Sequence, residues 1–165
     1  MAILRCDSYC GLYCGACEIV NAKTAEQKRR VIQMFESNIP GWQASAEQMK
    51  CSGCKTENVF VNCAKCPIRP CAQTKGVEFC HQCPDYPCPI HGFLQQASSQ
   101  VPVLRHLKAI EDNQQYIKAK GLSAWLKEQE EKWKCAACGN EFSWYADVCA
   151  GCGRDLRGTK DWEGK

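Results

Sequence analysis

The sequence predicts an α fold with irregular, metal-stabilised loops, in which a cysteine-rich helical domain is followed by a small β unit. Three observations support this prediction: the 165 residues include 16 cysteines, prolines interrupt the cysteine-rich loops, and amphipathic segments separate them. Hydrophobic residues make up 45% of the chain, but this figure counts the cysteines. Because the remaining apolar side chains are few for this length, disulfides or metal ions must hold much of the fold together.

The N-terminus favours metal ions over disulfides. Residues Met1 to Cys6 contain neither a long apolar run nor a small-residue cleavage site, so they are not typical of a signal peptide. No window of the sequence holds the ~18 apolar residues that a membrane span needs. We therefore expect a cytoplasmic protein with no membrane association, whose thiols stay reduced and whose Cys-x-x-Cys pairs bind metal.

The formal net charge of +3 treats every cysteine as neutral. Metal-bound thiols are deprotonated, so a dication held by four of them leaves a site with a charge of −2. Four such sites would change the formal +3 to about −5. The basic composition therefore gives no argument for a nucleic-acid partner.

Hydrophobic periodicity predicts helices near residues 24–39, 100–120 and 123–134. Thr24 and Gln27 are spaced as in a capping box at the start of the first helix. An apolar stripe spaced 4, 3 and 7 residues apart marks the second helix, at Val103, Leu107, Ile110 and Ile117. We expect His106 on the surface of this helix, and the tryptophans of the third helix, Trp125 and Trp133, in the core.

The segment from residue 51 to residue 88 contains an internal repeat. The pattern Cys-x-x-Cys-Pro-x-x-Pro-Cys runs from Cys63 to Cys71 and again from Cys80 to Cys88. Prolines at these positions oppose regular helix, so irregular loops are expected. Rigid loops suit metal ligands, because less backbone entropy is lost when the metal binds.

The C-terminal part contains two Cys-x-x-Cys-Gly knuckles, which end at Gly139 and Gly153. Glycine allows the positive φ that a tight knuckle needs, and the partly alternating segment 142–146 between the knuckles is expected to form strands. Two knuckles at this separation resemble a small β zinc ribbon. The resemblance implies a structural Zn²⁺ with all four ligand positions filled, by Cys135, Cys138, Cys149 and Cys152.

The motif Tyr9-Cys10-Gly-Leu-Tyr-Cys14-Gly-Ala-Cys17, together with Cys51-Ser-Gly-Cys54 and the repeated Cys-Pro pattern, is specific. In these features the chain resembles a prokaryotic, cysteine-rich family, the domain-of-unknown-function 3795 family. The resemblance covers about Ile3 to Trp133. It implies metal binding without an established activity, and similar proteins often carry a C-terminal zinc ribbon. Cys6 does not belong to the family pattern.

The number of cysteines allows four sites of four ligands each. One division is Cys6/Cys10/Cys14/Cys17, Cys51/Cys54/Cys63/Cys66, Cys71/Cys80/Cys83/Cys88 and the C-terminal four, and other divisions interleave the middle eight. If Cys6 is not a ligand, His91 could replace it, because Cys88-Pro-Ile-His91 has ligand spacing. The metal of the N-terminal domain is either Zn²⁺, favoured by paired Cys-x-x-Cys units, or [4Fe–4S], favoured by the Cys-Pro steps.

These features divide the chain into a cysteine-rich metal-binding domain over residues 1–133, a zinc ribbon over 134–154 and a disordered tail over 155–165. The leading functional hypothesis is a non-catalytic adaptor with structural zinc and a protein partner. One alternative is an iron–sulfur redox or accessory protein for an anaerobic enzyme. Another is a nucleic-acid binder that uses the ribbon and the basic segment 23–30. Catalysis is not favoured, since Cys80 and His81 are adjacent and no third group orients the histidine.

Overall fold

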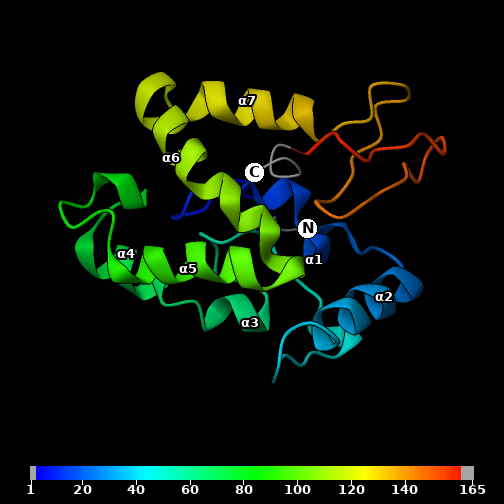
Figure 1. The fold of residues 1–165 in the computed structure, drawn as a ribbon, viewed down its shortest axis with the longest axis horizontal. Helices are drawn as coiled ribbons and strands as arrows, with labels where there is room; N and C mark the ends of the chain where they lie inside the picture. Colours follow the sequence, from blue (N-terminus) through cyan, green and yellow to red (C-terminus); the bar gives the residue numbers. More distant parts are fainter. Residues whose placement is uncertain (1–2, 161–165) are drawn as a thin grey trace.

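The computed structural model describes residues 3–160, and within them the chain is helical (Figure 1). The α-helices in this range are α1 Glu18–Asn21, α2 Ala25–Glu36, α3 Val61–Ala64, α4 Ile68–Lys75, α5 Pro89–Gln100, α6 Ala109–Lys120 and α7 Leu122–Lys132. Short 3₁₀ helices are η1 Cys14–Ala16, η2 Ala46–Gln48, η3 Cys80–Gln82 and η4 Pro102–Lys108. None of the helices in the described range is long and apolar enough to cross a membrane.

The prediction of a β zinc ribbon is wrong. Residues 3–160 contain no β-strand, and the C-terminal segment has only two isolated antiparallel bridges, Lys134 with Glu141 and Val148 with Asp155. Each bridge closes one cysteine knuckle and extends no further. The part of the fold-class prediction that describes a cysteine-rich helical domain agrees with the structure.

Tertiary hydrogen bonds explain why the segment between the knuckles does not form strands. The amide of Trp144 donates to the carbonyl of Ala16 at 2.9 Å, and the amide of Tyr145 donates to the carboxylate of Glu18 at 2.8 Å. A hairpin would need these amides for its own ladder. They bind η1 and α1 instead, so this segment is attached to the N-terminal part of the chain.

Helix α2 begins as its sequence predicts. The Thr24 side chain accepts the amide of Gln27 at 3.1 Å, and the Gln27 side chain accepts the amide of Thr24 at 2.9 Å. This reciprocal capping box satisfies amides that have no partner within the helix. The apolar face of α2 then packs through Val31 and Phe35 into one of the two hydrophobic cores.

The region expected to form one helix over 100–120 is divided by Pro102. Helix α5 ends at Gln100, Val101 is extended with φ −116° and ψ 113°, and η4 and α6 follow. A residue before proline avoids the helical conformation for steric reasons, so the break falls at Val101. Proline also starts α5, where Pro89 occupies the first turn and needs no hydrogen-bond partner for its nitrogen.

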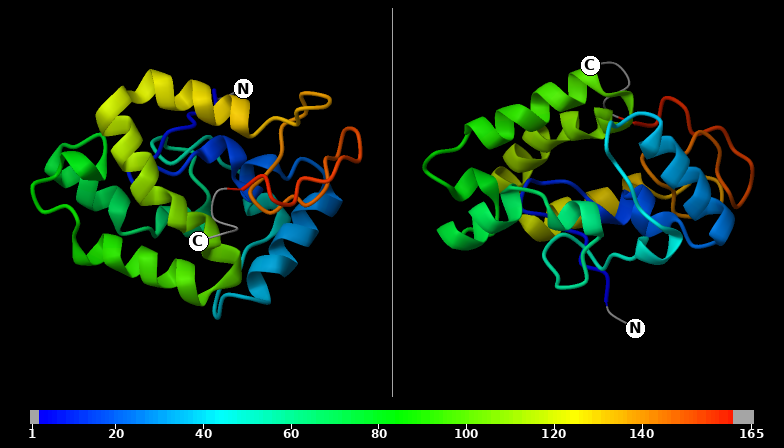
Figure 2. Two further views of the ribbon diagram at one scale, coloured as in Figure 1. Left: turned by 45° about the horizontal axis from the view of Figure 1, so that its top comes forward. Right: turned by 90° about the horizontal axis from the view of Figure 1, so that it is seen from below.

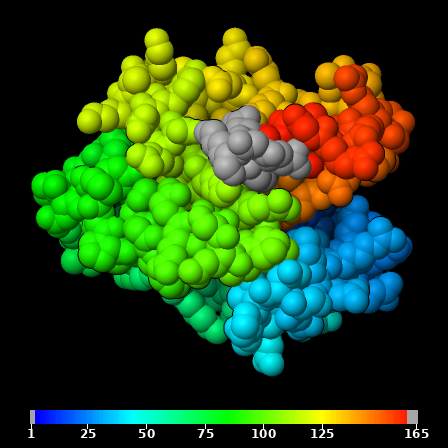
Figure 3. All heavy atoms as spheres, in the orientation of Figure 1, coloured from blue at the N-terminus to red at the C-terminus, as the bar shows by residue number. Residues whose placement is uncertain are grey.

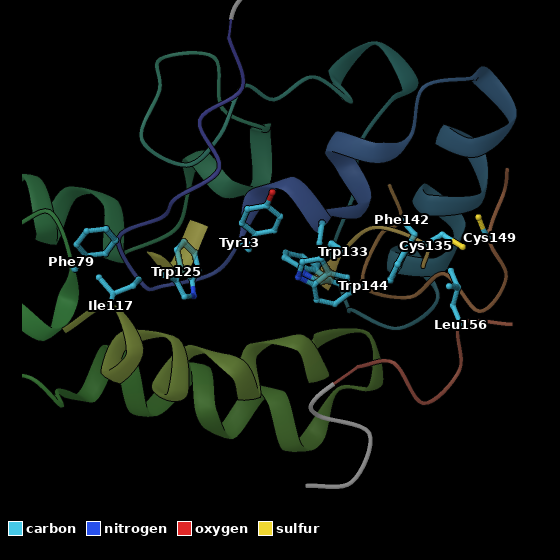
Figure 4. Close-up of a cluster of buried hydrophobic side chains, with 11 residues drawn as sticks. Tyr13, Phe79, Ile117, Trp125, Trp133, Cys135, Phe142, Trp144, Cys149 and Leu156 are labelled. Carbon is cyan, nitrogen blue, oxygen red and sulfur yellow. The ribbon is translucent and has the colours of Figure 1, made fainter. Parts of the chain in front are cut away.

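The larger hydrophobic core joins the helical part of the chain to the C-terminal segment. Trp133 and Trp144 lie together between Tyr13 and Phe142 in the close-up (Figure 4). Trp125 and Trp133 are buried, as expected. The buried members of this core include Tyr13, Phe79, Ile117, Trp125, Trp133, Phe142, Trp144 and Leu156.

The smaller core lies beneath α2. Phe35 and Trp42 stack with their ring centroids 5.1 Å apart, and Trp42 also contacts Phe60. All views place α1 and α2 beside the C-terminal segment, although these parts are far apart in sequence (Figure 2). The larger core contains residues from both sides of residue 133. The division of the chain into domains at that residue stays a prediction.

The last segment of the chain is described as far as Lys160. Within it, Leu156 is 2% exposed and belongs to the larger core. The sequence assigns residues 155–165 to a disordered tail, and of these residues 161–165 lie outside the described range.

Candidate metal centre

The two C-terminal knuckles have the same local structure. Gly139 and Gly153 have φ values of +74° and +75°, a conformation that favours glycine. Their amides donate back across the knuckles, from Gly139 to the carbonyl of Cys135 at 2.7 Å and from Gly153 to that of Cys149 at 2.9 Å. Each turn therefore places its two thiols on the same side of the chain.

The four thiols of the knuckles converge on one point. Cys135 Sγ lies 3.7 Å from Cys152 Sγ, and Cys138 Sγ lies 3.5 Å from Cys149 Sγ. All four sulfurs lie within 4.8 Å of one another. With metal–sulfur bonds of ~2.3 Å, a tetrahedron of thiolates has edges of about 3.8 Å. The arrangement therefore fits one metal ion, and the four cysteines are a candidate metal-binding site.

The surroundings of the knuckle cysteines favour the thiolate form of Cys135 and Cys149 but not that of Cys138. Cys135 and Cys149 are buried, whereas Cys138 and Cys152 are exposed. The amide of Ala137 lowers the pKa of Cys135, and the amide of Cys152 lowers that of Cys149. The amide of Asn140 also favours the Cys138 thiolate, but hydrogen bonds to the neighbouring thiols raise its pKa above the ordinary value. A bound cation would displace the protons that these sulfurs share.

The centre is anchored to the helical part by aromatic residues between the knuckles. Trp144 stacks on His106 with ring centroids 3.9 Å apart, and the Tyr145 hydroxyl lies 2.6 Å from His106 Nδ1. His106 is 5% exposed, so the expectation that it lies on the surface is wrong. The reason is tertiary: the face of η4 that the sequence leaves polar is covered by the C-terminal segment.

Seven further cysteines come from three separate stretches of the chain and influence one another electrostatically. Burial raises the pKa of Cys10 to about 12, and the charge of Cys54 adds to this effect. Burial likewise raises the pKa of Cys17 to about 12, with a contribution from Cys51. We call these seven the N-terminal thiol group: Cys10, Cys14, Cys17, Cys51, Cys54, Cys63 and Cys66.

Within the N-terminal thiol group, cysteines from different stretches of the chain lie next to one another. Burial raises the pKa of Cys63, and the charges of Cys17, Cys51 and Cys54 raise it further. Cys17 therefore lies near cysteines of the 51–66 segment. A buried thiol of raised pKa ionises only when a cation compensates its charge. The structure thus makes metal binding chemically reasonable here, while the ligand assignment within this group stays a prediction.

Cys6 has different neighbours. Burial raises the pKa of its thiol, a hydrogen bond from Tyr13 opposes the rise, and the charges that act on it are those of Glu141, Asp7 and Glu130. The backbone carbonyl of Cys6 accepts the amide of Cys14 at 2.7 Å. Its thiol therefore lies beside the larger core.

The remaining predicted ligands line a cavity next to α4 and α5. Its walls include His91 and the four cysteines Cys71, Cys80, Cys83 and Cys88. His91 is 4% exposed, and its Nε2 lies 3.2 Å from the Tyr86 hydroxyl. Burial lowers the pKa of His91, so the ring is held neutral.

A residue of α6 that the sequence did not indicate as important joins two of the cysteine-bearing loops. Gln114 of α6 is fully buried; its side-chain amide donates to the carbonyl of Tyr9 at 2.9 Å and its oxygen accepts the amide of His81 at 3.1 Å. It thereby connects the loop beside Cys10 with the turn that contains Cys80. The signal was present in the apolar stripe of α6, where position 114 lies between Ile110 and Ile117 and holds a polar residue.

A sequence model of the family described as "Protein of unknown function (DUF3795)" matches residues 6–92, more than half of the chain. The chain belongs to this family. The matched range contains every cysteine from Cys6 to Cys88, whereas the four C-terminal cysteines lie beyond it. The family description gives no function. Searches of curated proteins and of solved structures found no match.

Proposed function

We propose that this member of the DUF3795 family is a metal-binding adaptor in which one structural Zn²⁺ ion, held by the C-terminal knuckles, organises a surface for a protein partner. The observation that carries the proposal is the convergence of four sulfurs with separations of 3.5 and 3.7 Å between pairs. These separations suit tetrahedral zinc–thiolate geometry. All four ligand positions would be filled by the protein, so no position remains for a catalytic water.

The position of the centre explains why a structural ion would be useful. The knuckles begin directly after Trp133 and end shortly before Leu156, both of which belong to the larger core. Within residues 3–160 this segment has no strand ladder to define its path. A metal ion would fix the path instead, because binding energy at such a site contributes directly to folding.

Metal analysis with a single ligand variant tests the zinc assignment. Cys138→Ser should lower the zinc content by one ion per chain, and hydrogen exchange should accelerate at residues 134–156. Cys6→Ser, which removes a thiol beside Tyr13, is the matched control and should keep this zinc. The assignment fails if Cys138→Ser retains the wild-type zinc content, or if the metal lost is iron.

A groove beside the centre supports the adaptor part of the proposal. It has a volume of about 770 Å³ and runs between α1–α2 and the knuckles, whose Gly139 and Asn140 line it. The space-filling view has the C-terminal segment and α2 side by side on this face (Figure 3). Its lining includes three cations, Lys23, Arg30 and Lys134.

The charges of the groove suggest an acidic partner segment. One of its two carboxylates, Glu18, is engaged internally by the amide of Tyr145. Arg30 and Lys134 pair with Glu26 and Glu130 of their own helices, but these exposed pairs contribute little stability and can exchange for the carboxylates of a partner. An acidic peptide segment of a partner protein would therefore be complementary to this surface. Trp125, Trp133 and Trp144 are buried in the core and are not part of this face.

Charge reversal tests the groove. Wild-type protein and the control Lys118→Glu, on an exposed part of α6 outside the groove, should enrich the same partner from cell extract. The double variant Lys23→Glu/Arg30→Glu should lose it. If the double variant and the control enrich the same proteins, the groove is not the docking site. If the double variant loses bound nucleic acid and no protein, the partner is not a protein.

A further inference from the structure

A second candidate site lies well apart in sequence from the C-terminal centre, in the cavity between α4, α5 and the intervening loop. The cavity has a volume of about 40 Å³. Four cysteines line it: Cys71 from α4, Cys80 from η3, Cys83 from the loop and Cys88 directly before α5. Aliphatic side chains, among them Ile68 and Ile90, form much of the remaining wall.

The spacing of these four sulfurs differs from that of the C-terminal centre. Within residues 3–160, the knuckle cysteines are the one group of three or more metal-ligating side chains whose ligand atoms all lie within 4.8 Å. The cavity cysteines therefore surround a space without converging on one point. A single ion would need all four sulfurs about 3.8 Å apart. Four thiolates that bind four different metal atoms of a cluster stand further apart.

The size of the cavity agrees with a ligand of several atoms. A water molecule needs ~10–15 Å³ of such a cavity, so 40 Å³ accommodates a group larger than one ion. The lining is largely apolar, and the polar groups that face it are few. An all-thiolate, apolar site selects soft metal centres over magnesium or calcium.

Lys75 adds a cationic hydrogen-bond donor to one of the cavity sulfurs. Its Nζ lies 3.4 Å from Cys83 Sγ, and the same ammonium pairs with Asp85. A [4Fe–4S]²⁺ cluster with four thiolates carries a net charge of −2, which is costly in an apolar cavity unless a cation is close. Hydrogen bonds to ligand sulfur also set the reduction potential of such clusters. Lys75 is therefore placed to act as a positioning residue.

We propose that Cys71, Cys80, Cys83 and Cys88 bind one [4Fe–4S] cluster in this cavity, with Lys75 donating to the sulfur of Cys83. The site is independent of the proposed zinc centre, since the two share no ligand. His91, at the cavity wall and hydrogen-bonded to Tyr86, completes the enclosure and is not needed as a ligand.

Anaerobic reconstitution with ferrous iron and sulfide tests the proposal. Compared with wild type, Cys83→Ala should contain four fewer iron and four fewer acid-labile sulfide per chain, with unchanged zinc. Cys6→Ser should keep the wild-type content, because its thiol lies beside Tyr13. The proposal is overturned if Cys83→Ala keeps all of its iron and sulfide, or if it loses one zinc and no sulfide.

A second variant keeps the proposal testable should Cys83→Ala fail to fold. Lys75→Met leaves all four thiols in place but removes the cation beside the cluster. In a dithionite titration followed by electron paramagnetic resonance, each cluster takes up one electron, and the variant should need a lower potential because the added negative charge is less stabilised. A cluster signal with a wild-type potential in Lys75→Met would place the cluster elsewhere.

Discussion

His106 should make the stability of this protein depend on pH between 8 and 5. The ring is buried against Trp144 and Tyr145, and burial lowers its pKa to about 3. In the unfolded chain the ring titrates near its ordinary value of 6.5. Because the folded-state value is the lower one, the neutral ring stabilises the fold fully above about pH 6.5, and this stabilisation declines as the pH falls toward 3.

The size of the effect follows from the two pKa values. Below pH 6.5 the ring binds a proton in the unfolded state but not in the folded state. This difference lowers the free energy of unfolding by about 1.4 kcal/mol per pH unit. Between pH 8 and pH 5 the free energy of unfolding should therefore decrease by about 2 kcal/mol on account of His106. This is a substantial fraction of the ~5–15 kcal/mol that stabilises an ordinary domain.

Urea denaturation of wild type and His106→Phe at pH 8, 6 and 5 measures this contribution. Phenylalanine keeps a ring against Trp144 but does not titrate, and the lost hydrogen bond to Tyr145 lowers stability equally at each pH. Zinc content measured in parallel accounts for thiolate protonation, which affects both proteins. From pH 8 to pH 5 the wild type should therefore lose about 2 kcal/mol of stability relative to His106→Phe. A difference that stays constant over this range would mean that folding does not lower the pKa of His106.

Two further substitutions test the packing around the centres. Gly53→Ala should lower the free energy of unfolding by more than ~3 kcal/mol, because the new Cβ would lie 1.9 Å from the carbonyl oxygen of Arg5. The control Gly41→Ala, where the new Cβ would meet no atom within 4 Å, should cost only ~1 kcal/mol. Equal losses of stability in urea denaturation would contradict this prediction. Trp144→Ala should cost ~3–5 kcal/mol and accelerate hydrogen exchange at residues 140–146, whereas Trp42→Ala in the smaller core should leave exchange there unchanged.

The knuckles illustrate what short-range sequence can predict. Cys135 and Cys138 are three residues apart, and a glycine follows, so the local turn alone brings both thiols to one side. The ten residues between the knuckles allow the second pair to approach the first. The strands expected between them did not form, because the amides of Trp144 and Tyr145 bind Ala16 and Glu18, more than a hundred residues away.

The middle cysteines illustrate the opposite case. Dividing the cysteines into four sets of four offered Cys71, Cys80, Cys83 and Cys88 as one plausible quartet, and these four line one cavity. For the seven of the N-terminal thiol group, spacing left several divisions open. Which of them face each other depends on long-range contacts such as the 2.8 Å hydrogen bond from the amide of Arg5 to the carbonyl of Ser52, which joins two stretches that lie far apart in the sequence.

Short-range sequence defines the chemistry of this protein: which side chains can bind metal, where glycine allows a tight knuckle and where α2 begins. These are local properties, because bond geometry, proline, glycine and capping residues act over a few positions. Only the packing of distant segments buries His106, leaves residues 134–160 without a sheet and arranges four cysteines around a cavity. Those outcomes depend on which distant surfaces exclude water from each other, and the same local pattern is compatible with several such arrangements.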